Sequence, residues 1–174
     1  MEPTPRPAES PNDRPTAGDH RYLCDEMLKG LARWLRAAGH DTRVAPDGMP
    51  DRQVLTQALN DRRWLITRDA KLAEHRRADE VVVVLHHNDI TDCAREVSRR
   101  LRVNWLAAPF TRCLTCNTPL VTAPDDRAER LREELKGLVG EVRLCPHCDQ
   151  LYWAGGHVRR MRRRLENWQG GRFV

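Results

Sequence analysis

The chain has 174 residues, a net charge of +5 and 40% hydrophobic residues, which suits one ordinary domain with a small appended module. Its longest purely apolar run covers only residues 81–85, far short of the roughly 20 residues that cross a bilayer, so we expect no membrane segment. Residues 1–20 hold five prolines and almost no apolar side chains, which predicts a disordered tail and not a signal peptide. We therefore expect a cytoplasmic protein.

Between residues 21 and 106, short apolar runs alternate with amphipathic segments. The runs predict strands at residues 21–25, 41–45, 64–67 and 81–85, and apolar side chains at helical spacing predict helices at residues 27–38, 51–60 and 91–101. The last run is apolar throughout, which is typical of a strand covered on both faces. This alternation predicts an α/β fold in which a mainly parallel sheet lies between two layers of helices.

Acidic side chains follow the predicted strands. Asp25 ends the first strand, Asp69 comes two residues after the third and Asp89 follows the fourth, while Asp51 starts the helix after the second. Ligands of parallel sheets bind beyond the carboxyl ends of the strands, so we expect these side chains at one pocket. Carboxylate oxygens suit Mg²⁺ or Mn²⁺. The alternative is that each is an ordinary helix cap or turn residue, most plainly Asp51, which follows a proline, and Asp89.

Four of the six cysteines form two pairs with two residues inside each pair. They are Cys113 with Cys116 and Cys145 with Cys148. Two such pairs supply the tetrahedral set of four thiolates that zinc favours, and a set of four leaves no open coordination position. The sequence therefore predicts one structural zinc ion in an intracellular protein. The competing interpretations are redox-active pairs or unrelated buried thiols.

The residues around these pairs carry further expectations. Residues 117–144 separate the pairs and predict an inserted helix at 128–136. We expect His147, inside the second pair, to face solvent or to lie behind the zinc ligands. Cys24 falls on a predicted strand and Cys93 on a predicted helix, where a small buried apolar role is the default.

The positive charge is concentrated near the end of the chain. Residues 157–174 contain six arginines against one acidic residue, which suggests a polyanionic partner, although a solvated helix face is the alternative. Val158, Met161 and Leu165 form an apolar stripe that would dock this helix. The arginines beside the stripe are expected to contact phosphates without reading sequence; they are Arg159, Arg160, Arg162 and Arg163.

Three aromatic residues in the same region have two interpretations. Tyr152, Trp153 and Trp168 could stack on bases. Burial against the segment of the cysteine pairs is the alternative for Tyr152 and Trp153. His157 could point toward the acidic pocket expected at the ends of the strands.

Several ordered blocks of the sequence resemble the Mut-seven C-terminal RNase domain family. They are Asp25-Glu26-Met27-Leu28, Leu31-Ala32-Arg33-Trp34-Leu35-Arg36, Gly39-His40-Asp41-Thr42, Leu65-Ile66-Thr67-Arg68-Asp69, residues 109–117, and Cys145-Pro146-His147-Cys148 with Tyr152-Trp153 and Gly156-His157. The resemblance implies a PIN-like nuclease domain at residues 21–108 and a zinc ribbon with an arginine-rich helix at residues 109–174. It also implies single-stranded RNA as substrate and a divalent metal as cofactor.

Carried over residue by residue, the resemblance gives Asp25, Asp51 and Asp69 as catalytic metal ligands. Glu26 and Asp47 are rival acids near the first two, and Asp89 is a weaker candidate for a fourth acid. Arg68, and Lys29 one helical turn after Asp25, are candidate phosphate contacts, with a solvated lysine as the alternative for Lys29.

The working hypothesis is metal-dependent hydrolysis of RNA phosphodiester bonds. One alternative is an adaptor that binds nucleic acid without cleaving it. Another is a toxin-type nuclease held by a partner protein.

Overall fold

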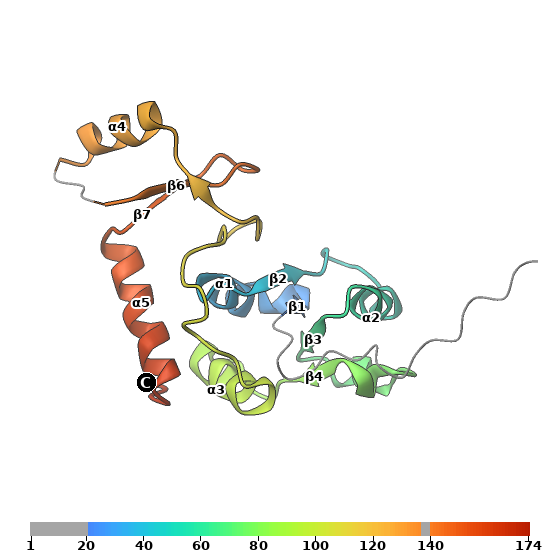
Figure 1. Ribbon diagram of the computed structural model, residues 1–174. Helices are drawn as coiled ribbons and strands as arrows, with labels where there is room; N and C mark the ends of the chain where they lie inside the picture. Colours follow the sequence, from blue (N-terminus) through green and yellow to red (C-terminus); the bar gives the residue numbers. More distant parts are fainter. Residues whose placement is uncertain (1–20, 137–139) are drawn as a thin grey trace, which may run out of the picture.

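The computed structural model describes residues 21–136 and 140–174 (Figure 1). The predicted disordered tail, residues 1–20, lies outside the described residues. A four-stranded sheet is built from β1 (Arg21–Cys24), β2 (Asp41–Val44), β3 (Trp64–Thr67) and β4 (Val82–Val84). Its helices are α1 (Lys29–Ala37), α2 (Asp51–Asn60) and α3 (Ile90–Leu101). No helix in these described ranges is both long and apolar enough to cross a membrane.

The four strands are parallel and lie in the order β2-β1-β3-β4, which confirms the predicted α/β fold. β4 is shorter than the predicted run, but the residues that flank it still bond to β3. The Leu65 amide donates to the Val81 carbonyl at 2.9 Å, and the Leu85 amide donates to the Thr67 carbonyl at 2.7 Å. The apolar run therefore predicted the pairing correctly, with the ends displaced by one residue.

Helices cover both faces of the sheet, as predicted. On one face, Leu31 and Leu35 of α1 and Val97 of α3 share a core with Ile66. On the other face, Leu55 of α2 packs in the core that contains Leu23 and Leu65. Because consecutive strand residues point to opposite faces, β1 and β3 contribute side chains to both cores.

The start of the first helix and the cap role suggested for Asp51 differ in the structure, although α2 itself begins at Asp51 as predicted. A short 3₁₀ turn, Glu26–Leu28, precedes α1, and the Asp25 side chain accepts a hydrogen bond from the Glu26 amide at its start. Asp51 is the first helical residue of α2 and not its cap; Pro50 holds the cap position without a side-chain hydrogen bond. Asp51 still favours the helix, since a carboxylate in the first turn interacts well with the helix dipole. Asp89 caps α3 as predicted.

A second, antiparallel sheet carries the cysteine pairs. It consists of β5 (Val121–Thr122), β6 (Val142–Leu144) and β7 (Leu151–Trp153). The inserted helix, α4 (Asp125–Glu134), begins three residues before the predicted start. Pro124 precedes it in an extended conformation, and proline is tolerated at a helix start because it has no amide to leave unsatisfied.

The last helix, α5 (Gly156–Gln169), packs against α1 and α3 (Figure 1). Met161 and Leu165 are buried in the core that contains Leu31 and Val97, so the predicted docking stripe is confirmed. The prediction that Trp168 could stack on bases is wrong. Trp168 is only 2% exposed, and its ring lies 4.9 Å from that of Trp34. Its helical spacing from Leu165 continues the buried stripe by one more turn.

We predict that Gly39→Ala destabilises the fold by about 3 kcal/mol or more, near the upper range for single substitutions. Gly39 has a φ of +100°, and a Cβ there would lie 2.3 Å from the Ala108 carbonyl oxygen. Gly48→Ala is the matched control, because Gly48 also has positive φ (+72°) but has no atom within 4 Å of an added Cβ. Gly48→Ala should lower the free energy of unfolding by only about 1 kcal/mol. Urea unfolding measures both, and equal losses would contradict the steric argument.

Candidate functional site

The four paired cysteines come together at one point. The Cys113 and Cys148 sulfurs are 3.5 Å apart, and the Cys116 sulfur is 3.4 Å from that of Cys145 and 3.9 Å from that of Cys148. Four sulfurs that each bind one zinc ion at about 2.3 Å stand roughly 3.8 Å from one another in a regular tetrahedron. The thiols are therefore arranged to hold a metal ion such as zinc.

Both cysteine pairs have the same local turn. In the first turn the Asn117 amide donates to the Cys113 carbonyl, and in the second the Asp149 amide donates to the Cys145 carbonyl. The residue after each pair has a positive φ, 71° at Asn117 and 61° at Asp149, a conformation that Asn and Asp tolerate better than most side chains. The second cysteine of each pair, Cys116 or Cys148, turns its amide toward the sulfur of the first.

Tyr152 supports the first pair with its hydroxyl. The Leu114 amide donates to this oxygen at 3.1 Å, and the hydroxyl hydrogen is available to donate to the Cys113 sulfur, also at 3.1 Å, when that sulfur is a thiolate. Burial opposes ionisation of Cys113, but the bond from Tyr152 and backbone amides outweigh it and lower the pKa of this thiol to about 6. A low pKa favours the thiolate, the form that binds metal. His147 is exposed, in keeping with the expectation that it faces solvent.

The two remaining cysteines are buried, as predicted. Burial raises the pKa of Cys24 to about 12, so this thiol stays protonated. Cys93 donates a hydrogen bond to the His87 carbonyl at 3.2 Å. Both thiols act as small core side chains.

Asp25 and Asp69 lie at the carboxyl ends of two neighbouring parallel strands, β1 and β3. The last residue of β3, Thr67, connects them. Its hydroxyl donates to Asp25 Oδ2 at 2.7 Å and accepts from the Asp69 amide at 2.9 Å. Thr67 was not among the site residues predicted from the sequence. The available signal was a hydroxyl side chain at the end of a buried apolar strand, where a polar group needs a partner.

The aspartates also have the local roles that the alternative interpretation gave them. Asp25 Oδ1 accepts from the Glu26 amide at 2.7 Å, and Asp69 Oδ1 accepts from the Lys71 amide at 2.8 Å. Hydrogen bonds fix the orientation of both carboxylates. Each carboxylate has about four lone-pair sites, so capping leaves acceptor capacity for a ligand.

The loop before α2 is tied to the turn after β1. Glu26 accepts a hydrogen bond from the Gly48 amide at 2.6 Å, and Lys29 pairs with Asp47 at 2.6 Å. Two of the candidate residues, Lys29 and Asp47, thus contact each other at the exposed surface. Asp51, half-buried, begins α2 directly after this loop.

Within residues 21–136 and 140–174, the cysteines are the only group of three or more metal-binding side chains that bring their ligand atoms within 4.8 Å of one another. A magnesium or manganese site at Asp25, Asp51 and Asp69 therefore stays a prediction.

A family model, the Mut7-C RNAse domain, matches residues 20–165. The chain belongs to the Mut7-C RNAse domain family. A search of curated proteins and a search of solved structures found no match. Membership confirms the resemblance seen in the sequence and indicates a nuclease family.

The candidate RNA-binding residues of this Mut7-C chain differ in how they are held. Arg68 donates to the Asn88 side chain, and Arg159 donates to the Ala154 carbonyl at 2.9 Å. Arg162 lies over the Phe110 ring. Arg160 and Arg163 are exposed and make no hydrogen bond or ion pair with the described part of the chain.

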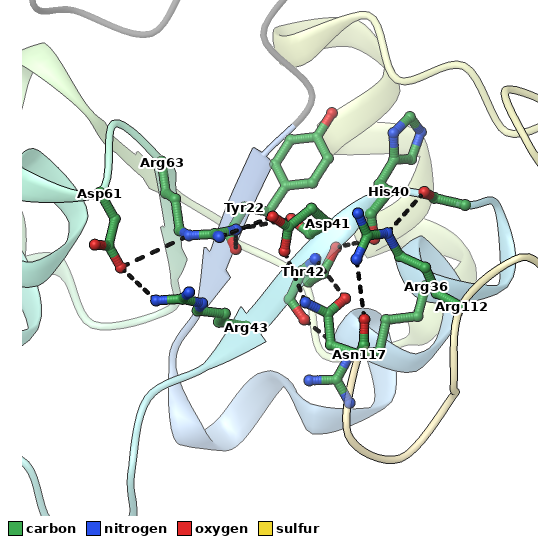
Figure 2. Close-up of polar contacts among 11 residues, drawn as sticks. Tyr22, Arg36, His40, Asp41, Thr42, Arg43, Asp61, Arg63, Arg112 and Asn117 are labelled. Atoms are coloured by element: carbon green, nitrogen blue, oxygen red, sulfur yellow. Dashed lines mark hydrogen bonds and ion pairs between the residues drawn. The ribbon is translucent and has the colours of Figure 1, made fainter. Parts of the chain in front are cut away.

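A polar junction joins the first cysteine pair of the Mut7-C chain to the parallel sheet (Figure 2). The Asn117 side chain bonds to two residues of β2. Its Nδ2 donates to the Asp41 carboxylate at 2.7 Å, and its Oδ1 accepts from the Thr42 backbone amide at 2.9 Å. The buried Arg36 of α1 donates to three backbone carbonyls, those of Thr42, Leu114 and Thr115. The turn that carries Cys113 and Cys116 is therefore fixed to α1 and β2.

We predict that Asp41 makes the fold sensitive to acid. Burial alone would raise its pKa, but hydrogen bonds from Arg63 and Asn117, with the charges of Arg63 and Arg112, lower it from 3.8 to about 2. Because the folded-state pKa lies below the unfolded value, the stabilisation is complete above about pH 4 and is lost as the pH falls toward about 2. The shift corresponds to about 2 kcal/mol.

The measurement is the difference in unfolding free energy between wild type and Asp41→Asn in urea. This difference should shrink as the pH falls from about 5 to about 3. Any metal release from the cysteines at low pH would affect both proteins alike, so the comparison isolates Asp41. A difference that does not change with pH would contradict the assignment.

Proposed function

We propose that this Mut7-C chain is a metal-dependent ribonuclease that hydrolyses phosphodiester bonds of single-stranded RNA. The observation that carries the proposal is the hydroxyl of Thr67, which connects Asp25 and Asp69 at the carboxyl edge of the sheet. Ligands of open parallel sheets bind at this edge. The family model supports the nuclease class.

Asp25 and Asp69 would hold one Mg²⁺ or Mn²⁺ ion, with Asp51 completing the ligand set. Their oxygen donors suit these hard cations. Such an ion, when bound, supplies charge that stabilises the transition state of phosphodiester hydrolysis and activates water. Thr67 keeps the Asp25 carboxylate in one orientation, because it donates to Oδ2 while the Glu26 amide donates to Oδ1.

Basic side chains around this edge would position the substrate. Arg68 directly precedes Asp69, and Lys29 lies on the exposed side of α1 near its start. Arg160 and Arg163 on the outer face of α5 would add phosphate contacts, together with Arg159 and Arg162. Such contacts raise affinity for any RNA sequence and weaken with salt.

The four cysteines would hold one zinc ion with a structural role, because a complete set of four thiolates leaves no position for a substrate. Reduced thiols are typical of the cytoplasm, and we place the protein there.

The test is cleavage of end-labelled single-stranded RNA by the zinc-loaded protein in Mg²⁺, in Mn²⁺ and in the presence of a chelator. The chelator removes Mg²⁺ and Mn²⁺ but binds zinc too weakly to extract it from the cysteines. We expect products with either ion, none with the chelator, and none from Asp69→Asn. Binding of the same RNA by Asp69→Asn should persist and should weaken as salt is raised.

Two other outcomes would overturn the proposal. Binding without cleavage under every condition would favour the adaptor. Cleavage that survives loss of Asp69 would move the active site elsewhere. The toxin alternative concerns cellular role, and it predicts growth arrest on expression of wild type but not of Asp69→Asn.

A further inference from the structure

A cavity of about 370 Å³ lies where α1, the first cysteine pair and α5 meet. Arg33 of α1, Tyr152 and Trp153 of β7, and His157 of α5 line it. Cavities that bind small organic ligands begin at about 300 Å³, so this one has room for one nucleotide. It is separate from the aspartates at the end of the sheet, none of which lines it.

The walls of the cavity combine apolar and aromatic surface with few polar groups. Leu114, Leu151 and Val158 line it together with Tyr152 and Trp153. The Tyr152 hydroxyl is already engaged with Cys113, so this residue offers its ring and not its oxygen. Flat aromatic surface binds nucleobases by stacking and tolerates any base.

The charged side of the cavity favours an anion. The Arg33 guanidinium donates to His157 Nε2 at 3.1 Å. Since arginine has no acceptor, His157 Nε2 must accept, and the ring then carries its hydrogen on Nδ1. The bond uses one of the five N–H groups of Arg33, so the others remain for a ligand. No acidic side chain lines the cavity in the part of the chain that the structure describes.

The cavity is connected to the candidate active site by the surface of α1. Lys29 and Arg33 are both exposed and lie four residues apart, on the same face of the helix. The rise from Lys29 to Arg33 is about 6 Å, and Asp25 lies one 3₁₀ turn before Lys29. A strand of a few nucleotides could therefore run along α1 from Arg33 at the cavity, past Lys29 with its partner Asp47, to the carboxyl edge.

We propose that this cavity binds one nucleotide of the RNA strand, with the base against Tyr152 and Trp153 and a phosphate at Arg33 and His157. It would be a subsite a few nucleotides from the bond that is cleaved. The subsite rests on the proposed function for its role in cleavage, but nucleotide binding can be measured without any cleavage.

The test uses the full zinc-loaded chain and the four ribonucleoside 5′-monophosphates as probes, with the indole N–H resonance of Trp153 and calorimetric titration as readouts. We expect each nucleotide to shift the Trp153 resonance. Arg33→Ala should raise the Kd about tenfold, the size of effect that loss of one charge-assisted contact gives. The matched control is Arg52→Ala, which removes an exposed arginine from α2, on the other face of the sheet, and should leave the Kd unchanged.

Two further probes, nucleosides and inorganic phosphate, show which part of the nucleotide is recognised. Nucleosides without phosphate should bind about tenfold more weakly than nucleotides if Arg33 holds the phosphate. Inorganic phosphate that reproduces the full Trp153 shift would overturn the nucleotide assignment, because no base would then be needed. An unshifted Trp153 resonance, or equal losses in Arg33→Ala and Arg52→Ala, would overturn the cavity as the site. Zinc content and melting temperature of each variant check that it is folded.

In RNA cleavage, Arg33→Ala should raise KM about tenfold and leave kcat within about twofold, as expected for uniform binding. If wild type does not cleave RNA but nucleotides still bind, the ribonuclease proposal fails and the binding site stands. If wild type cleaves and neither binding nor KM depends on Arg33, the subsite fails and the ribonuclease stands.

Discussion

Asp25→Asn is expected to lower the rate of RNA cleavage by about 10³-fold, the rate equivalent of about 4 kcal/mol of transition-state stabilisation. Asparagine keeps the size of the side chain and an oxygen that can accept from the Glu26 amide. It removes the negative charge that a divalent cation needs. The measurement is the initial rate of cleavage of labelled RNA in Mn²⁺, at saturating RNA.

Asp89→Asn is the matched control, because Asp89 caps α3 through two backbone amides but makes no bond to Thr67. Asparagine caps helices about as well as aspartate, so both cleavage and stability should stay close to wild type. Thr67→Val keeps the shape of the side chain and removes the hydroxyl. We expect Thr67→Val to lower the cleavage rate about tenfold, within the range for a group that orients a metal ligand. A wild-type cleavage rate in Asp25→Asn would remove Asp25 from the site.

Cys145→Ser is expected to weaken zinc binding by more than about 100-fold, since even residues behind the ligands contribute 10- to 100-fold. The same loss should lower the melting temperature, because metal binding and folding of a four-thiolate site are coupled. Native mass spectrometry should give one zinc per chain for wild type and none for the variant. Thermal unfolding with and without a strong zinc chelator gives the second readout.

Cys93→Ser is the control for this experiment. Cys93 is a buried thiol outside the cluster that donates to the His87 carbonyl, and serine can donate the same hydrogen bond. Its zinc content should equal that of wild type. Full zinc content in Cys145→Ser would contradict a structural zinc at this site. So would a wild-type melting temperature that does not change when the chelator is added.

The parallel sheet could be predicted because its signals are local. The valine run before Leu85 and the alternation of apolar runs with amphipathic segments reflect burial on both faces, which the sequence records directly. The cysteine cluster could be predicted for the same reason, since a pair with two intervening residues has one compact geometry that suits a metal. Helix ends were less accurate, because Pro124 and the two acids after it start α4 earlier than its apolar pattern.

Contacts between distant segments could not be predicted in this way. Arg36 is an ordinary helix residue in the sequence, and only the fold brings it to the carbonyls of Leu114 and Thr115. Trp168 belongs to a strongly basic segment, so its neighbours in the sequence suggested RNA, whereas its neighbours in space are Trp34 and Trp105. Thr67 has a role only because β1 and β3 lie side by side.

The position of Trp168 affects how the protein folds during synthesis. The rings of Trp34 and Trp105 contact Trp168, with centroids 4.9 and 4.8 Å from it, and Trp105 precedes it by 63 residues. At about 5–20 residues per second, a ribosome needs roughly 3–13 s to add this interval. During that time the sheet and its first helices lack one side of their core, so the nascent chain exposes two tryptophan rings to chaperones and to other chains. Completion of α5 ends this exposure.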